Sequence, residues 1–312
     1  MSEARKGILA MVAACVIWGL SSLYYKLVAH VPPLEVLSHR TLWSLLFFGI
    51  VLSVQGRLGE IARLLRAPRV LALVFLAALM ISANWFMFIY SVQVGRAMQA
   101  SLGYYIFPLV AVMLGFVTLG ERLSPGKWAA VGLAGLAVAV LTWGLGAAPW
   151  ISLALAFTFG FYGLLKKGSP AGPVVSVTTE VLLLSPLALI WLWGVHVQGW
   201  EGLVGRNLGT FGHDLGDSLI LAASGVLTGG PLILFSYASK RVSLATVGLV
   251  QYVNPTLQFL VATLAFAEPV TPWHAVAFPL IWVALGLYSW DSLRQDRAAR
   301  RAEVSAGTSA TT

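Results

Sequence analysis

The sequence is short of cysteine and of charge. Cys15 is the single cysteine among 312 residues, which excludes a disulfide framework and a cysteine-based metal site. Only 10% of the residues are charged, whereas a soluble domain carries about 25%. The GxxxxGKS/T, HExxH and GxSxG patterns are absent as well. ATP-driven pumping and hydrolysis therefore have no basis in the sequence, and we predict no catalytic residue, cofactor or metal site.

Apolar residues are abundant instead. They make up 58% of the chain, and the mean hydropathy is +0.83. About 20 apolar residues cross the hydrocarbon core as a helix, so runs of that length are candidate spans. Ten such runs occur, at 7–28, 34–54, 70–90, 97–119, 127–145, 148–166, 174–194, 218–238, 244–266 and 273–290. The predicted fold class is an all-α integral membrane protein with ten transmembrane helices.

The few charged residues are unevenly distributed. The net charge is +8, but no basic stripe with interleaved aromatic residues accompanies it, so we expect no nucleic-acid partner. Along the predicted spans, 16 of the 20 Lys and Arg residues fall on one side of the membrane and 2 on the other. Positively charged connections stay in the cytoplasm. This asymmetry predicts a multi-pass protein in the lipid bilayer with both termini cytoplasmic.

The chain contains an internal duplication. The stretch 99–109 has a counterpart 147 positions later, at 246–256. The same shift pairs Tyr105 with Tyr252, Pro108 with Pro255, and Glu121 with Glu268. Each half has an odd number of spans, so the second half enters the membrane from the opposite side. We predict two inverted five-helix repeats, 7–145 and 148–290, followed by a disordered cytoplasmic tail, 291–312.

Ionisable residues inside the predicted spans are costly and mark candidate sites. Arg40, with Lys26 and His39, could bind an anion or a carboxylate, but a structural ion pair or carbonyl clamp explains Arg40 equally well. Lys26 could instead extend to the interface, and His39 could be a packing histidine. Glu180 could carry a coupling proton or partner a basic group.

Two prolines inside the spans predict interrupted helices. Pro108 and Pro255 each remove a backbone donor, and a membrane tolerates the freed carbonyl only where protein or water satisfies it. Broken helices of this kind often line substrate sites. The surrounding side chains predict a mixed pocket near the middle of the membrane, formed by Asn84, Trp85, Tyr104, Tyr105, Gln251 and Tyr252. For any single one of them, an interhelical hydrogen bond is the simpler explanation.

These residues resemble the EamA branch of the drug/metabolite transporter superfamily. The resemblance covers nearly all of 7–290 and rests on Trp18-Gly19, Tyr25-Lys26, His39-Arg40, Asn84-Trp85, Ala100–Tyr104 with Pro108-Leu109, Leu119–Arg122, and Gln251-Tyr252 with Pro255-Thr256. It implies a ten-helix permease of the bacterial inner membrane that moves small organic solutes, often outward. The chain departs from the family pattern with Gln99 in place of Glu, Phe107 in place of Asn and Ser22 in place of Pro.

The preferred hypothesis is secondary-active transport of a small-molecule solute by alternating access between the two repeats. Lys26, His39 and Arg40 would attract or orient a polar group, and the pocket residues would contact the solute. The alternative is an integral membrane enzyme acting on lipid-linked substrates. Its only candidate groups lie in the long connection 195–217, at His213, Asp214 and Asp217. A membrane partner protein without transport activity is a third hypothesis.

Overall fold

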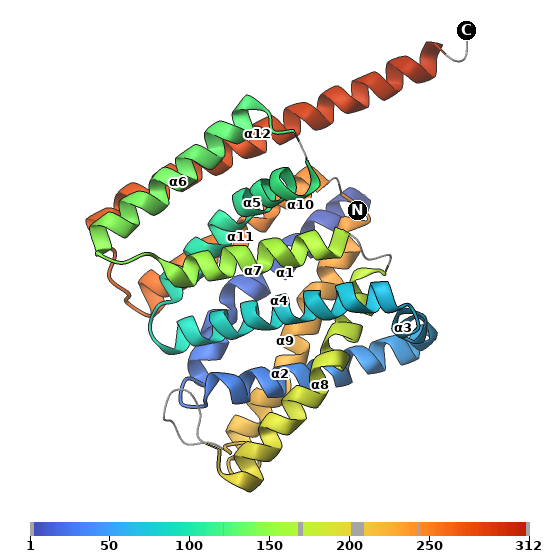
Figure 1. Cartoon of the computed structure of the whole chain (residues 1–312), viewed down its shortest axis with the longest axis vertical. Helices are drawn as coiled ribbons and strands as arrows, with labels where there is room; N and C mark the ends of the chain where they lie inside the picture. The colour runs from blue at the N-terminus through green and yellow to red at the C-terminus, as the bar shows by residue number, and fades with distance from the viewer. Residues whose placement is uncertain (1–2, 121, 168–170, 201–208, 243, 310–312) are drawn as a thin grey trace.

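The chain folds into a bundle of helices (Figure 1). The computed structural model describes residues 3–120, 122–167, 171–200, 209–242 and 244–309. The helices within these ranges are α1 (Glu3–Leu27), α2 (Pro33–Val54), α3 (Leu58–Leu65), α4 (Pro68–Gln93), α5 (Ala97–Leu119), α6 (Pro125–Leu145), α7 (Trp150–Lys167), α8 (Pro173–Gln198), α9 (Leu215–Ser239), α10 (Leu244–Gln251), α11 (Val253–Leu260), the π-helical turn η1 (Val261–Ala265) and α12 (Pro272–Ser309).

The helices have the lengths and surfaces of a membrane protein. Within the described ranges, 8 are long and apolar enough to cross a bilayer: α1, α2, α4, α5, α6, α8, α9 and α12. A shorter apolar helix covers Trp150–Lys166. Large apolar side chains such as Leu46, Ile50 and Trp143 are exposed, while Arg40 and Glu180 are buried. Because lipid surrounds the protein where water surrounds a soluble domain, this distribution confirms an all-α membrane protein.

The two prolines of the duplicated segments have different effects. α10 ends at Gln251 and α11 begins at Val253, so the apolar segment is interrupted at Tyr252. Pro255 lies in the first turn of α11, where its missing N–H has no intrahelical partner to lose. Pro108 instead lies inside α5, which continues from Ala97 to Leu119, so the expected break at Pro108 does not occur. A membrane helix tolerates one missing hydrogen bond when its neighbours hold it in place.

Glycines let pairs of helices approach closely. A Cβ at Gly103 of α5 would lie 2.7 Å from the Ser152 carbonyl oxygen of α7, and one at Gly225 of α9 would lie 2.4 Å from the Trp43 carbonyl oxygen of α2. The hydrophobic effect does not drive helices together in lipid, so close van der Waals packing at small residues holds them. These contacts position α2, α5 and α7, which carry much of the candidate site.

A residue from far along the chain caps the N-terminus of α5. Arg96, at the cap position, makes no side-chain capping hydrogen bond. The Glu268 carboxylate accepts hydrogen bonds from the backbone N–H groups of Ala97 at 2.7 Å and Met98 at 2.8 Å. Ala267 adopts a left-handed φ of 52°, which turns the chain just before Glu268. The carboxylate therefore satisfies two orphan donors and the positive end of the helix dipole.

The C-terminal segment differs from the expected disordered tail. α12 continues as helix through residues 291–309 to Ser309 (Figure 1). Alanine and arginine favour helix, so a segment rich in both can prolong an existing helix without an apolar face. Residues 201–208 of the predicted connection 195–217 and Glu121, the duplicated counterpart of Glu268, lie outside the described residues.

The close contact at Gly225 predicts a selective loss of stability. Gly225→Ala places a methyl group against backbone atoms of α2, so we expect a decrease of about 1–3 kcal/mol in unfolding free energy. The thermal midpoint of the purified protein in detergent measures it. Gly132→Ala is the control, because a Cβ there has open space within 4 Å. Equal midpoints for the two variants would contradict the packing role of Gly225.

The cap at α5 predicts a second loss of stability. Glu268→Ala leaves the Ala97 and Met98 donors unpaired, so we expect the unfolding free energy to fall by about 0.5–2 kcal/mol, the usual range for a lost cap. The control is Glu60→Ala, which removes a partly exposed ion pair with Arg57 and should cost about 1 kcal/mol or less. A thermal midpoint for Glu268→Ala at or above that of the control would refute the capping role.

Candidate solute site

Arg40 lies on α2 among side chains from α1 and α4. It is 7% exposed, and one guanidinium nitrogen donates a hydrogen bond of 2.7 Å to the Tyr25 hydroxyl. The guanidinium also lies over the Trp85 ring, 4.0 Å from its centroid. Its Nε has no hydrogen-bond partner in the part of the chain that the structure describes. Among the residues that the structure describes, Arg40 forms no ion pair.

Asn84 joins three helices beside Trp85. Its amide oxygen accepts a hydrogen bond of 2.9 Å from the Tyr104 hydroxyl of α5. Its amide nitrogen donates to the Leu155 carbonyl at 3.0 Å and to the Thr158 hydroxyl at 3.1 Å, both on α7. Asn84 therefore fixes the direction of Tyr104 and ties α4 to α5 and α7.

Aromatic rings connect Arg40 with the interior of the bundle. Phe88 packs edge-on against both Tyr25 and Tyr104, with ring centroids 5.7 Å and 5.8 Å apart. Phe159 of α7 contacts Tyr104 on one side and Phe107 on the other, at 5.9 Å and 4.8 Å. Phe107, which replaces the Asn of the family pattern, therefore extends the apolar wall that these rings form.

Burying a guanidinium without a carboxylate partner is energetically unfavourable. Removing a charge from water costs several kcal/mol unless an opposite charge and hydrogen bonds offset it. Removing one partner of a buried ion pair costs about 3–5 kcal/mol. Tyr25 and Trp85 supply one neutral acceptor and one π face. The remaining donors of Arg40 suit a planar anion such as a carboxylate, which binds guanidinium with two parallel hydrogen bonds.

Lys26 and His39 do not join Arg40. Lys26 is exposed, and its ammonium lies 5.3 Å from the Phe266 ring centroid. His39 stacks on Phe211 with ring centroids 4.5 Å apart, on the side of α2 that faces the connection between α8 and α9. Of the three basic residues grouped by the sequence, only Arg40 enters the aromatic site.

Tyr105, Gln251 and Tyr252 also lie apart from Arg40. The Tyr105 hydroxyl is 2.7 Å from the Thr256 hydroxyl of α11, and its ring packs edge-on against Phe278 of α12. Gln251 ends α10, and Tyr252 occupies the interruption before α11, both partly buried. These residues surround the break near Pro255.

Glu180 is part of a buried hydrogen-bonded ion pair between α7 and α8. Its side chain is fully buried, and one carboxylate oxygen lies 2.6 Å from the Lys166 ammonium. The same carboxylate accepts hydrogen bonds from Ser176 at 2.9 Å and from Tyr162 at 3.1 Å. The Tyr162 ring stacks on Phe159, which continues the aromatic wall from Tyr104. A basic partner for Glu180, one of the two interpretations from the sequence, is therefore present.

Sequence reasoning missed several of these partners. A shift of 140 positions aligns Lys166 with Lys26 and Glu180 with Arg40, so each basic residue precedes its counterpart by 14 positions, but this alignment does not by itself assign Lys166 as the partner of Glu180. Opposite charges at that spacing could have indicated the pair. Tyr25, the partner of Arg40, carried no signal beyond its place in the family pattern.

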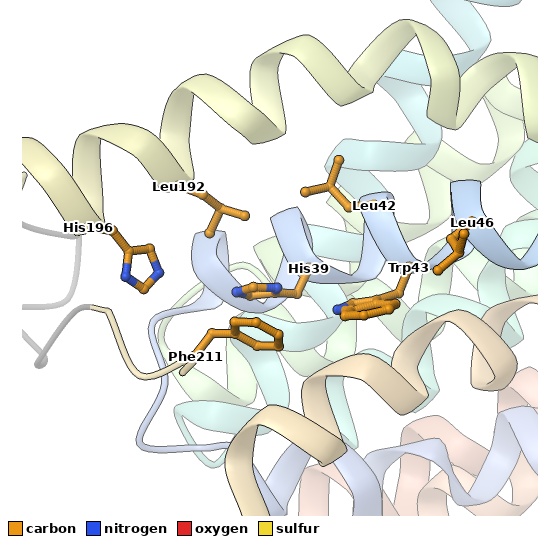
Figure 2. A pocket seen from close by; sticks show the side chains of 7 residues that line it. All are labelled: His39, Leu42, Trp43, Leu46, Leu192, His196 and Phe211. Atoms are coloured by element: carbon orange, nitrogen blue, oxygen red, sulfur yellow. The ribbon is translucent and has the colours of Figure 1, made fainter. Parts of the chain in front are cut away.

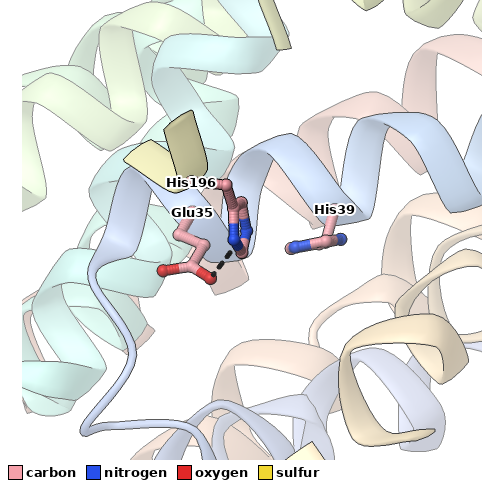
Figure 3. Close-up of side chains that lie close together, drawn as sticks. All are labelled: Glu35, His39 and His196. Atoms are coloured by element: carbon pink, nitrogen blue, oxygen red, sulfur yellow. Dashed lines mark ion pairs between the residues drawn. The ribbon is translucent and has the colours of Figure 1, made fainter. Parts of the chain in front are cut away.

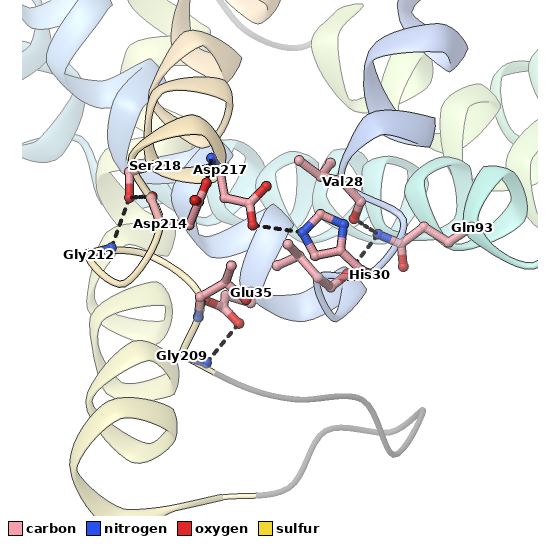
Figure 4. Close-up of polar contacts among 11 residues, drawn as sticks. Val28, His30, Glu35, Gln93, Gly209, Gly212, Asp214, Asp217 and Ser218 are labelled. Carbon is pink, nitrogen blue, oxygen red and sulfur yellow. Dashed lines mark hydrogen bonds and ion pairs between the residues drawn. The ribbon is translucent and has the colours of Figure 1, made fainter.

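Two of the three groups suggested for a lipid-directed enzyme have structural roles, and the third, His213, is exposed. Asp214 caps α9 by accepting a hydrogen bond from the Asp217 N–H at 2.8 Å. The Asp217 carboxylate lies 2.7 Å from His30, and nearby Gln93 donates to the Val31 carbonyl at 2.9 Å (Figure 4). These contacts tie Asp217 at the start of α9 and Gln93 at the end of α4 to the α1–α2 connection, and they give no reason to assign catalysis.

Comparisons with known proteins show which family the chain is similar to. The profile of the EamA-like transporter family matches residues 5–143. The chain is 42% identical to Protein RarD of Streptomyces exfoliatus, over 98% of this chain and 96% of that protein. It is 36% identical to Protein RarD of Escherichia coli, over 95% and 97%, and 40% identical to an uncharacterized transporter of Pseudomonas aeruginosa, over 94% and 96%.

A solved crystal structure shares the fold. It matches with a TM-score of 0.55 at 19% sequence identity, over 90% of this chain and 96% of that chain. The near-complete coverage of relatives above 30% identity establishes the family for the whole chain. This chain belongs to the RarD group of the EamA-like transporter family and is a membrane transporter of small solutes.

Proposed function

We propose that the transported solute carries an anionic group and that Arg40 binds it. The observation that carries this proposal is the burial of Arg40 beside Tyr25 and Trp85 without an ion pair among the described residues. The Trp85 ring fixes the guanidinium plane, and Asn84 with Tyr104 forms the adjoining wall. A carboxylate on a small organic molecule satisfies the charge and the free donors together.

The proposed transport cycle is alternating access in the bacterial inner membrane. Residues 7–145 and 148–290 would form two inverted five-helix repeats, with α7 and the interrupted segment Leu244–Ala265 counted among ten spans. The excess of Lys and Arg at one end of the spans supports cytoplasmic termini. The two halves would rock around the site, and Tyr105, Gln251 and Tyr252 would contact the solute as it moves past the interruption near Pro255.

Removing the Arg40 charge tests solute binding. In Arg40→Gln we expect saturable flux into proteoliposomes to fall by roughly 10-fold or more, since charge-assisted hydrogen bonds contribute about 1.5–3 kcal/mol. In the unaltered protein, organic acids should raise the thermal midpoint more than their primary amides do. Neutral chloramphenicol, named in one relative from Pseudomonas aeruginosa, belongs in the same panel.

Lys26→Gln provides the matched control. It removes one cation from the neighbouring helix α1, but that ammonium is exposed and directed toward Phe266. We expect its flux to remain near that of the unaltered protein. Unchanged flux in Arg40→Gln, together with equal stabilisation by acids and amides, would overturn the anionic-solute proposal.

We propose further that Glu180 couples transport to protons. Lys166 holds the carboxylate at 2.6 Å, and Tyr162 links it to the aromatic wall that reaches Tyr104. Opening the pair during the cycle would leave a buried carboxylate that is more stable protonated than charged. The pair would thus take up and release a proton as the halves move.

A double variant tests this coupling without leaving an unpaired charge. Lys166→Met with Glu180→Leu replaces the pair with apolar residues, which is often tolerated in a buried site. We expect solute exchange to continue while accumulation driven by a pH gradient is lost. The control removes the surface pair instead, through Arg57→Met with Glu60→Leu. Gradient-driven accumulation that persists in the double variant, or is absent from the unaltered protein, would contradict the proposal.

A further inference from the structure

Three metal-binding side chains lie together at the end of the bundle where α8 leads into α9 (Figure 3). Glu35 and His39 are four residues apart on α2 and therefore share one face, and His196 comes from the last turn of α8. One ligand atom from each lies within 4.8 Å of the others. Donors around a zinc ion are about 3.3 Å apart, given bonds of about 2.0–2.1 Å. The three donors would therefore have to move closer together to bind such an ion, and the exposed His196 has room to do so.

Glu35 is oriented as a metal ligand would be. Its side chain is fully buried, and its two oxygens accept hydrogen bonds from the N–H groups of Gly209 at 3.2 Å and Thr210 at 3.0 Å (Figure 4). Each carboxylate oxygen keeps a second lone pair. Hydrogen bonds of this kind are the usual support behind a ligating carboxylate.

His39 has a buried ring nitrogen that forms no hydrogen bond with the described residues. The residue is 5% exposed, and its ring is held against Phe211 by stacking. Its Nε2 has no hydrogen-bond partner within the described ranges of the chain, an arrangement that costs about 1–3 kcal/mol. His196 Nε2 lies 3.9 Å from the nearer Glu35 oxygen, which is beyond hydrogen-bond distance. A cation between the three side chains would satisfy all of these groups.

We propose that Glu35, His39 and His196 bind a zinc ion or a similar divalent transition metal. Two imidazoles with one carboxylate suit zinc, whereas magnesium and calcium prefer oxygen ligands. Three protein ligands leave a fourth coordination position. Both histidines line a hollow of about 410 Å³ whose walls also include Leu42, Leu192 and Phe211 (Figure 2). A water molecule or a donor atom of a small ligand can complete the coordination there.

The site joins parts of the chain that are far apart in the sequence. Its ligands tie α2 to the last turn of α8, and Gly209–Thr210 attaches the following segment to the same carboxylate. A bound metal would therefore restrain the movement of α2 relative to α8. This inference does not rest on the proposed anionic solute, because none of the observations behind it involves the Arg40 side chain.

Metal binding to the full-length protein without a histidine tag tests the proposal. We expect zinc chloride to raise the thermal midpoint in detergent with one-to-one stoichiometry by calorimetry, and magnesium chloride to have no effect. Cobalt(II) in place of zinc should give the visible absorption of a site with low coordination number. His196→Ala and His39→Gln should each raise the Kd for zinc by roughly 10-fold or more, since even supporting groups contribute that much.

His213→Ala is the matched control, because it removes an exposed histidine from the same end of the protein without touching the cluster. Its zinc affinity should equal that of the unaltered protein. His196 is exposed, so its variant should fold, and its thermal midpoint without metal verifies this. No zinc binding at millimolar concentration, or equal affinity in His196→Ala, His39→Gln and His213→Ala, would overturn the site.

Discussion

Hydrocarbon around the bundle accepts and donates no hydrogen bonds, so each polar group inside it must be matched by the protein or by a ligand. Asn84 makes hydrogen bonds with both its oxygen and its nitrogen, and Glu180 has a lysine, a serine and a tyrosine. Arg40 and His39, consecutive on α2, each keep a nitrogen atom that has no hydrogen-bond partner among the described residues. Because the matched groups need no ligand and these two nitrogen atoms do, both proposed sites lie on α2.

The same constraint explains where the backbone can be interrupted. The break at Tyr252 is supported by side chains from a neighbouring helix and from the next turn. Ser101 of α5 donates to the Pro255 carbonyl at 2.8 Å, and Thr256 donates to the Tyr252 carbonyl at 2.7 Å. Pro108 has no such break because α5 packs backbone to backbone against α7 at Gly103. The duplicated prolines thus give one interrupted segment and one continuous helix beside it, an asymmetry that suits a fixed support next to a segment able to bend.

The bilayer made much of this fold predictable from the sequence. Its thickness sets the length of the apolar runs, so the long helices could be placed, and burial of Arg40 followed from its depth in a span. The direction of a side chain around its helix was not predictable in the same way. Lys26 and His39 were grouped with Arg40 by distance along the chain, but they face elsewhere. His196 was beyond reach of sequence reasoning, because it meets Glu35 and His39 only when α8 packs on α2.

The positions of His39 and Arg40 connect the two proposed sites mechanically. Consecutive residues on a helix point about 100° apart, so one faces Phe211 and His196 while the other faces Tyr25 and Trp85. Gly225 of α9 lies directly against the backbone of α2 at Trp43, one turn further along, which leaves α2 little room to bend between the two sites. If α2 moves as one body, a displacement that reorients Arg40 toward a solute also displaces His39. A metal held by Glu35, His39 and His196 would fix α2 to α8 and so set the position of the arginine from a different face of the same helix.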